Sequence, residues 1–273
     1  LQLTGRGVTF VWKDKKSGSS ATFSKEKGEE IYRKVSGKTA VITEVKKTKK
    51  TSQPEGLYDL TDLSRDANQR FGFSAKQTLN IMQSLYEHHK ILTYPRTDSR
   101  YLTTDVAETL RERVEAIAVG PYRSFTGTVL KGKILPKKSF VNNQKVSDHH
   151  AIIPTEQPVI LAQLSVDERK IFDLVVRRFL AVLYPPYEYE QTRLTLSCEG
   201  ETFFAEGNIT LNRGYKEVTV LEGEESGKVF PDLKEGDSIK DFSLKKTEGK
   251  TKPPARFTEG TLLKAMENPV RYM

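Results

Sequence analysis

The hydrophobic pattern of this chain changes twice, and this change limits the possible folds more than any other feature. Near both ends, apolar residues alternate with polar ones or form β-branched runs, as in Val8–Trp12 and Thr192–Leu196. Between Asp59 and Leu183 they recur at three- and four-residue spacings, the period of an amphipathic helix. We therefore predict a multidomain α+β fold, in which a discontinuous β-rich domain holds an inserted helical domain.

The predicted boundaries follow from the same pattern. Residues 1–58 and 187–250 form the β-rich domain, residues 59–186 form the helical domain, and residues 251–273 begin a further helical domain. The 273 residues suffice for one large core or two modest ones. Both ends interrupt predicted elements, so we expect the chain to be a piece of a larger protein. The double connection between the domains can act as a hinge.

Capping signals place the helices. A short helix is predicted from Ser24 to Val35. In the helical block, Gly72 ends a first helix, and Ser74 with Gln77 opens a second whose core face holds Ala75, Leu79, Met82 and Tyr86. Thr103 or Thr104 caps a third helix, and Ser165 with Glu168 opens a fourth that Pro185–Pro186 ends.

The remaining segments have weaker patterns. Residues 120–144 are irregular and basic, which is typical of a loop. Beyond residue 187, strands are predicted at Thr192–Leu196, Glu201–Ala205, Glu217–Leu221 and Ser238–Leu244, and Thr258 begins a last helix. The lysine run Lys46–Lys50 is a solvated strand end or, in a nucleic-acid-binding protein, a contact to the phosphate backbone.

Charge and composition point to a polyanionic partner. The formal net charge is +8 and the sequence pI is about 9.3, although a basic surface alone is weak evidence. The single cysteine, Cys198, excludes an internal disulfide framework and lies in a strand-like run, where packing is its expected role. No apolar run approaches the ~20 residues of a membrane span and no signal peptide opens the chain, so we expect an intracellular protein without a membrane partner.

The stretch Ile91–Leu102 carries the residues best suited to chemistry. Pro95 biases Tyr94 towards an extended backbone, so the preceding helix ends before it and the phenol is presented from a turn. Arg96 supplies a planar fork of donors that matches a phosphate. A tyrosine nucleophile suits phosphoryl transfer between nucleic-acid strands, and its ordinary pKa of about 10 requires a positive neighbour such as Arg96. The alternative is an ordinary turn in which Asp98 or Ser99 caps the next helix.

Four motifs in collinear order carry a family resemblance. The run ILTYPRTDSRYL resembles the active-site segment of type IA DNA topoisomerases, and its Tyr-Pro-Arg form is most similar to the bacterial topoisomerase III branch. The other three are Leu57–Leu60, Asp148–Thr155 and Pro253–Gly260. Motifs spread over about 200 residues in the same order are far more specific than any one of them.

The resemblance implies a role for each matching residue. Tyr94 is the catalytic nucleophile and Arg96 stabilises phosphate charge. His149, at the motif's spacing before Ala-Ile and the proline, contacts the DNA phosphate near the scissile position and senses strand binding through its charge. The further residues implied are Arg256, Thr97 and Ser99 for DNA binding, with Asp98, Thr258 and Glu259 in support.

The implied activity is transient cleavage and religation of one DNA strand through a 5′-phosphotyrosyl intermediate, without ATP, for relaxation or decatenation. The partners are a single-stranded segment for cleavage and a duplex or second strand for passage. Mg²⁺ belongs to an acidic TOPRIM domain expected before residue 1, and a Gly- and Thr-rich motif is expected after Met273. We therefore expect this fragment to bind DNA without cleaving it, to hold no cofactor itself and to be monomeric. The resemblance places it in the bacterial cytoplasm, associated with the nucleoid.

The histidines give little support to a metal site. All four occur as adjacent pairs, His88–His89 and His149–His150, and neighbouring residues in a strand point to opposite faces. We expect the first pair to interact with carbonyl groups at a helix C-terminus. No zinc motif or glycine-rich phosphate loop appears.

Other function classes fit less well but stay open. A relaxase-type transesterase requires two histidines separated by one apolar residue, and a tyrosine recombinase requires a dispersed Arg-His-Arg set. A non-enzymatic module could bind single-stranded DNA through basic grooves and stacked aromatic residues such as Tyr101 or Tyr122.

Overall fold

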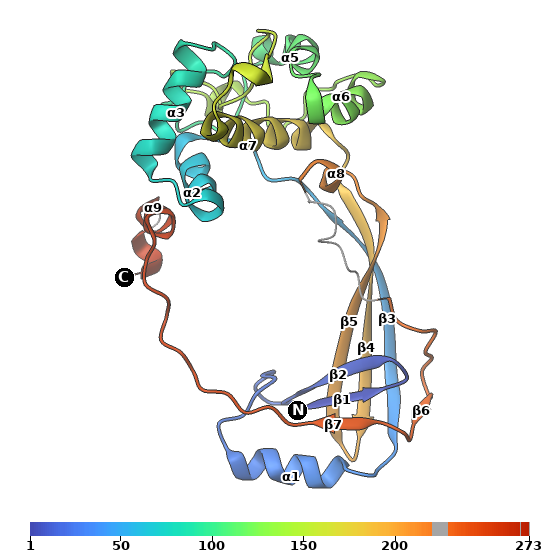
Figure 1. Ribbon diagram of the computed structural model, residues 1–273. Coiled ribbons are helices and arrows are strands. Elements are labelled where there is room, and N and C mark those ends of the chain that lie inside the picture. The colour runs from blue at the N-terminus through green and yellow to red at the C-terminus, as the bar shows by residue number, and fades with distance from the viewer. Residues whose placement is uncertain (220–228, 268, 273) are drawn as a thin grey trace. The chain divides into compact units, whose positions relative to one another are not determined.

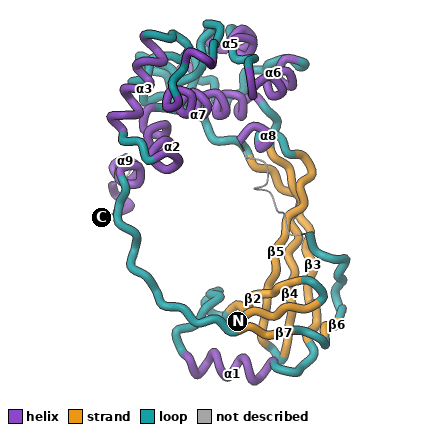
Figure 2. Tube along the Cα trace, in the orientation of Figure 1, coloured by secondary structure: helices purple, strands orange, loops and turns teal. Residues whose placement is uncertain are grey.

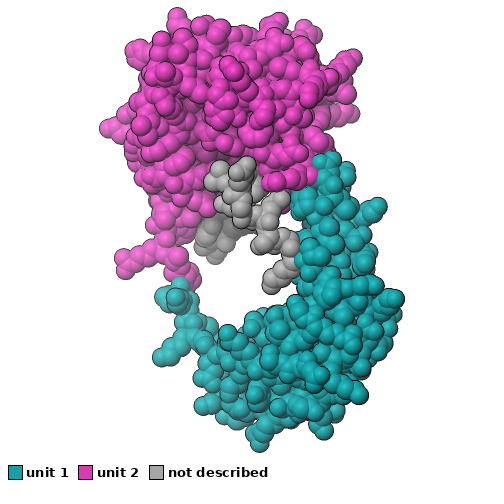
Figure 3. Space-filling view, turned by 45° about the vertical axis from the view of Figure 1, so that its right-hand side comes forward, with its two compact units in different colours: residues 1–52, 187–212, 222–253 teal, residues 53–186, 213–221, 254–273 magenta. Residues whose placement is uncertain are grey.

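The structure is a computed structural model that describes residues 1–219, 229–267 and 269–272. Contacts divide the chain into two compact units, coloured separately in Figure 3. The sheet unit comprises residues 1–52, 187–212 and 222–253, and the helical unit comprises residues 53–186, 213–221 and 254–273. The predicted α+β class is confirmed, since most of the described helices and the antiparallel sheet lie in different parts of the chain (Figures 1 and 2).

The described part of the sheet unit forms one antiparallel sheet of seven strands in the order β6-β3-β4-β5-β2-β1-β7. Three long neighbours dominate it: β3 (Ala40–Ser52), β4 (Tyr187–Cys198) and β5 (Glu201–Asn212). The shorter strands are β1 (Gln2–Gly5), β2 (Val8–Lys13), β6 (Ser238–Ile239) and β7 (Ser243–Lys245).

The core of the sheet unit lies at one end of the long strands. Helix α1 (Lys25–Val35), capped by Ser24 as predicted, buries Ile31 and Val35 against this core. Cys198 is buried in the same cluster, which confirms its packing role, and burial raises the pKa of its thiol. The strands alternate buried and exposed side chains here, because one face of the sheet covers the cluster.

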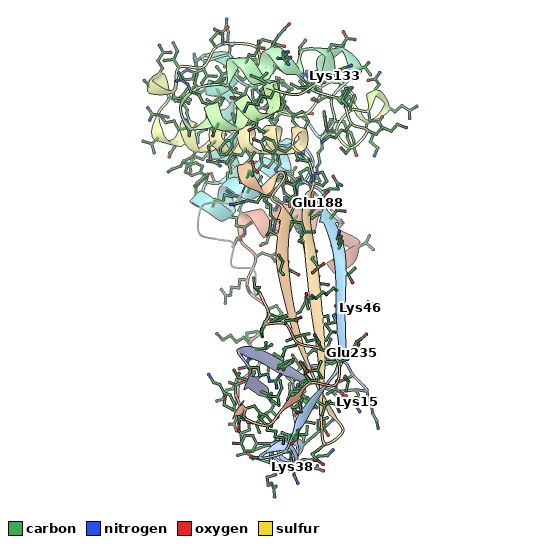
Figure 4. The ribbon with its side chains drawn as sticks, turned by 90° about the vertical axis from the view of Figure 1, so that its right-hand side faces the viewer. Lys15, Lys38, Lys46, Lys133, Glu188 and Glu235 are labelled. Atoms are coloured by element: carbon green, nitrogen blue, oxygen red, sulfur yellow. The ribbon has the colours of Figure 1, made fainter. Side chains whose placement is uncertain are left out.

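Beyond Ile42, β3 has no fully buried residue. Its lysines pair in register with polar residues of β4, for example Lys46 with Arg193 and Lys49 with Glu190. The lysine run is therefore solvated and lies within a strand rather than at its end; Lys46 and Glu188 mark this stretch in Figure 4.

The helical unit is built around α7 (Val166–Leu183), which α2 (Leu60–Phe71), α3 (Ala75–Glu87) and α6 (Arg123–Leu130) contact. Smaller helices are α4 (Thr104–Glu108), α5 (Leu110–Ala116), α8 (Lys216–Thr219) and α9 (Glu259–Glu267), with single 3₁₀ turns at Gly120–Tyr122, Asn143–Lys145, Leu161–Gln163 and Pro269–Tyr272. The α7 face from Ile171 to Val182 supplies much of the core, since nine of its residues are buried. The predicted capping box of Ser165 and Glu168 is present.

Several local predictions were wrong. Residues 120–144 contain α6, which Gly127 and three hydroxyl residues obscured in the sequence. The predicted strand Glu217–Leu221 begins inside α8, and its residues 220 and 221 lie outside the described part. The third helix is broken into α4 and α5 at Thr109, and Thr103 precedes it without a side-chain capping bond.

The domain boundaries also differ from the expected ones. Residues 53–58 belong to the helical unit, because Tyr58 forms a β-bridge with Ile152 and lies in the helical core. Residues 254–273 belong there too, since α9 packs on α2. None of the described helices has the length and apolar character needed to cross a membrane.

Candidate active site

The end of α3 delivers Tyr94. The backbone N–H groups of His88 and His89 both donate to the carbonyl of Ser84, and Lys90 adopts a left-handed conformation with φ of 57°. The N–H of Ile91 then donates to Leu85, so the helix closes as predicted before the Tyr94 turn. Leu92 is buried and forms a β-bridge with Pro154. The chain thus leaves α3 along the segment that contains the histidine motif.

The expectation for the first histidine pair was only partly right. Backbone groups, not the side chains, satisfy the carbonyls at the end of α3, while the Nε2 of His89 lies 3.2 Å from a carboxylate oxygen of Glu168 on α7. The same oxygen accepts a hydrogen bond of 2.7 Å from Ser84. This contact ties the end of α3 to α7.

Buried and exposed residues alternate through the Tyr94 segment, which we define as residues 93–101. Thr97 and Ser99 are buried, whereas Arg96 and Asp98 are exposed. The Oγ1 of Thr97 donates to the carbonyl of His149 over 2.9 Å and accepts from the N–H of Ser99 over 3.1 Å. The Oγ of Ser99 donates to the carbonyl of Lys145 over 2.8 Å. Because both hydroxyls are engaged, the geometry favours their role in organising the turn over direct contact with DNA.

The phenol ring of Tyr94 is half-buried between two other rings. The centroid of His149 lies 4.2 Å away with the planes tilted by 38°. The ring of Tyr86 meets it edge-on, at 5.5 Å and 82°. Tyr94 is thus not enclosed by aliphatic side chains, and two residues from separate sequence motifs, Tyr94 and His149, come together as the family pattern implies.

The charged residues of the segment face solvent. Arg96 and Asp98 form no hydrogen bond or ion pair through their side chains with the residues that the structure describes. The guanidinium of Arg96 is therefore available to an anion two residues from the phenol. His149 is exposed as well, and its carbonyl is held by Thr97.

The two histidines at 149 and 150 have different surroundings. His150 is half-buried, and its Nδ1 lies 2.8 Å from the carbonyl of Ala151. Burial lowers the pKa of His150, and the positive charge of Arg113 acts in the same direction. His150 is therefore neutral near pH 7, so it does not suit the charge-sensing role that the resemblance implies for His149.

The Leu57–Leu60 motif supports the far end of the Tyr94 segment. Asp59 caps α2 through the N–H of Asp62, and its second oxygen accepts a 2.6 Å bond from Arg100. Arg100 also pairs with Asp62 at 3.0 Å. Tyr58 is buried and donates to Asp66, and burial raises the pKa of its phenol. The sequence analysis did not predict the pairing of Arg100 with Asp59 and Asp62. Acidic residues are common at the start of a helix, where they usually act only as caps, so they gave no signal of a second role.

The last two residues of the Pro253–Gly260 motif lie near the start of α3. Arg256 is exposed; Thr258 caps α9, because its Oγ1 accepts from the N–H of Thr261. Glu259 accepts a 2.9 Å bond from the N–H of Ala75, the first residue of α3. A helix of 13 residues is about 20 Å long. Glu259 is thus separated by the length of α3 from the turn that presents Tyr94.

Two further observations concern base stacking by Tyr101 or Tyr122 and the binding of a metal ion. Tyr122 is buried and donates to Asp173, so it offers no face for base stacking, whereas Tyr101 is half-buried beneath the ammonium of Lys145. Among the described residues, no group of three or more His, Cys, Asp or Glu side chains is arranged to hold a metal ion. Asp59 and Asp62, two carboxylates at the start of α2, are both paired with Arg100. These residues do not fit a Mg²⁺ site.

Comparison with known proteins identifies relatives along almost the whole chain. A sequence profile described as DNA topoisomerase matches residues 2–269. DNA topoisomerase 3 of Bacillus licheniformis is 50% identical over 272 residues, which cover 98% of this chain and 37% of that protein. DNA topoisomerase 3 of Bacillus subtilis is 48% identical over 273 residues and is covered to 38%.

A solved structure agrees. Full-length topoisomerase I from Thermotoga maritima matches with a TM-score of 0.73 and 27% identity, over 97% of this chain and 42% of that one. The chain thus spans well under half the length of the relatives it matches. With the profile covering nearly all of its residues, the chain belongs to the DNA topoisomerase family, as the type IA, topoisomerase III-like resemblance indicated.

Proposed function

We propose that this chain is the part of a type IA DNA topoisomerase that carries the nucleophile, Tyr94. The observation that supports this most is the meeting of Tyr94 and His149, whose rings lie 4.2 Å apart at an accessible surface. The whole protein is proposed to cut and rejoin one DNA strand, so that it relaxes or unlinks DNA. Its substrates are a single-stranded segment for cleavage and a second strand or duplex for passage.

The chemistry follows from the residues present. The Oη of Tyr94 forms a bond to the phosphorus of a phosphodiester while the bond to the 3′ oxygen breaks. The phenol proton is lost and the leaving 3′ oxygen gains one, which leaves a 5′-phosphotyrosyl ester and a 3′-hydroxyl. Because an ester replaces an ester, the reverse attack needs no ATP. Arg96 stabilises negative charge on the phosphate, and His149 contacts the phosphate beside the phenol.

The support of the Tyr94 ring is part of this proposal. Thr97 holds the His149 backbone, so one hydrogen bond fixes the nucleophile's segment to its partner's. Such fixed geometry lowers the cost of aligning the reacting atoms. Asp98 and Ser99 shape the turn, whereas Arg256 offers a DNA contact from its own exposed segment and Thr258 and Glu259 hold that segment in place.

Magnesium is proposed to be bound by acidic residues outside these 273, where it would neutralise charge on the phosphate. We therefore propose that the chain alone binds DNA without cleaving it. A bacterial cytoplasmic location and a monomeric state complete the proposal.

The test is adduct formation in the full-length protein. Wild-type protein incubated with labelled single-stranded DNA and Mg²⁺ should yield a covalent complex that survives denaturation, and Tyr94→Phe should abolish it. Tyr32→Phe on α1 is the matched control and should leave the adduct unchanged. An adduct that persists in Tyr94→Phe ends the assignment, and binding without any adduct in the wild type favours the non-enzymatic single-strand-binding alternative.

A further inference from the structure

A groove opens beside Tyr94 within the helical unit. Its cavity volume is about 610 Å³, inside the range of roughly 300–1,000 Å³ typical of small-molecule sites. The last turn of α3 contributes Tyr86 and Glu87, the following turn contributes Lys90, and His150 lines another part. The proposed mechanism uses only Tyr94 of these residues, so the others need a separate explanation.

Tyr86 is an unexpected member of this lining. Its spacing on α3 predicts a core position, but the buried residues of that helix are Thr78, Met82 and Leu85. Tyr86 is 37% exposed. Its plane is nearly perpendicular to that of Tyr94, so the two rings do not stack face to face. An exposed aromatic ring at a proposed DNA site is suited to stacking on a base.

The polar groups of the groove also have a defined chemistry. Since a carbonyl only accepts, the 2.8 Å contact with Ala151 requires a proton on the Nδ1 of His150. Burial lowers the pKa of His150, so the neutral imidazole leaves its Nε2 as an acceptor. The side chains of Glu87 and Lys90 have no hydrogen-bond or ion-pair partner among the described residues. The groove therefore offers an aromatic face, acceptors and one cation.

We propose that this groove binds the nucleobase next to the phosphate at Tyr94, with Tyr86 stacking on the base and His150 accepting a hydrogen bond from its exocyclic amino group. Lys90 contacts the adjoining DNA backbone. Cytosine and adenine carry such an amino group, whereas thymine presents a carbonyl oxygen in its place. The site therefore favours cytosine or adenine over thymine. This inference rests on the proposed function, since it requires DNA at Tyr94.

Binding by the 273-residue chain tests the groove without cleavage. The probes are a fluorescent ten-nucleotide thymine strand and the same strand with one central cytosine, measured by anisotropy. We expect the cytosine strand to bind about fivefold more tightly, the size of one hydrogen bond. Tyr86→Ala and Tyr86→Leu should each weaken binding of both strands about tenfold through lost stacking. His150→Ala should remove only the preference for cytosine.

Control variants separate the groove from general effects. Tyr86→Leu keeps an apolar side chain against Tyr94, so it guards against misfolding, and thermal unfolding of every variant checks this. Tyr32→Leu is the matched control on α1 and should change neither affinity nor preference. Unchanged affinity in both Tyr86 variants, equal binding of the two strands by wild type, or a preference that survives His150→Ala overturns the proposal.

The two hypotheses fail in different ways. If Tyr94→Phe abolishes the adduct in the full-length protein while the base preference is missing, the groove assignment alone is wrong. If the adduct persists in Tyr94→Phe, the nucleophile assignment is wrong whatever the base preference shows.

Discussion

Among the four family motifs, the Tyr94 segment and the C-terminal segment are held by the structure in different ways. The Tyr94 segment is fixed on both sides: Thr93 bonds to Ala151 and Ile153, Thr97 to His149, and Ser99 to Lys145. In the C-terminal segment, residues 254–267, the stretch 254–258 is exposed. Glu259 and Gly260 bond to α3 and α2, respectively. Two segments that both carry family motifs can therefore differ in how firmly the fold holds them.

Arg100 links the two segments. It pairs closely with Asp59 and Asp62 and lies 3.6 Å from Glu267 at the end of α9. The last of these pairs is partly exposed and worth little by itself. The C-terminal segment thus depends chiefly on the packing of α9 against α2, whereas the Tyr94 segment depends on buried hydrogen bonds. Substitutions in each segment test this difference.

The largest effect is expected for Thr97→Val in the Tyr94 segment. Valine keeps the shape but leaves the carbonyl of His149 and the N–H of Ser99 without the Thr97 hydroxyl. Unpaired buried polar groups cost about 1–3 kcal/mol each, so we expect a loss of about 2–3 kcal/mol in the free energy of unfolding. Urea denaturation measures it. Thr97→Ser retains the hydroxyl and should lose less than about 1 kcal/mol; equal stability of the two variants would show that the hydroxyl is unimportant.

A smaller effect is expected for Gly260→Ala in the C-terminal segment. A Cβ at this position would lie 3.0 Å from the Oδ1 of Asn68 and 3.3 Å from the carbonyl of Arg65, so α9 must shift away from α2. Alanine is the better helix former, which offsets part of the cost, and we expect α9 docking to weaken by about 1 kcal/mol. Hydrogen exchange should then be faster in α9 but unchanged in the Tyr94 segment.

Gly249→Ala is the matched control for this change. No atom lies within 4 Å of a Cβ at Gly249, and its backbone is not left-handed. Exchange in α9 should stay at the wild-type rate. If Gly260→Ala also speeds exchange around Thr97, the two segments are more strongly coupled than their contacts indicate.

Sequence patterns correctly predicted those features of the fold that depend on residues close together in the sequence. The capping box at Ser165, the cap at Ser24 and the glycine stop at Gly72 were all correct, because each requires only a few adjacent residues. The break at Thr109 and helix α6 were missed, since tertiary packing decided them.

For the site, the family resemblance implied that Tyr94 and His149 would meet. The exposure of Tyr86 was not predicted. Hydrophobic periodicity indicates which face of a helix is apolar, but it does not show how far along that face other elements pack. The sequence also did not reveal that Glu259 bonds to the start of α3, a contact between residues 184 positions apart. Such pairings depend on the whole fold.

The smallest effect concerns the contact between α3 and α7 that precedes the Tyr94 segment. Burial opposes ionisation of Glu168, but hydrogen bonds from Ser84 and Ser165 outweigh it and lower its pKa from 4.5 to about 2. A lowered pKa means that the ionised carboxylate stabilises the fold above pH 4.5, and that this contribution is lost as the pH falls towards 2. Glu168→Gln should therefore cost about 0.5 kcal/mol at pH 7, and the difference from wild type should shrink steadily below pH 4.5.

Asp167→Asn is the matched control, because Asp167 also lies in the first turn of α7 but, among the described residues, pairs with the half-buried Lys170 of the same helix rather than with α3. It removes the same charge from the helix start without touching α3. Urea denaturation between pH 7 and pH 3 should show the pH-dependent difference for Glu168→Gln and a much smaller one for Asp167→Asn. Equal curves for the two variants would mean that Glu168 acts only through the helix dipole. The end of α3 would then be held without help from Glu168, and the Tyr94 segment would owe its order to its own hydrogen bonds, those of Thr93, Thr97 and Ser99.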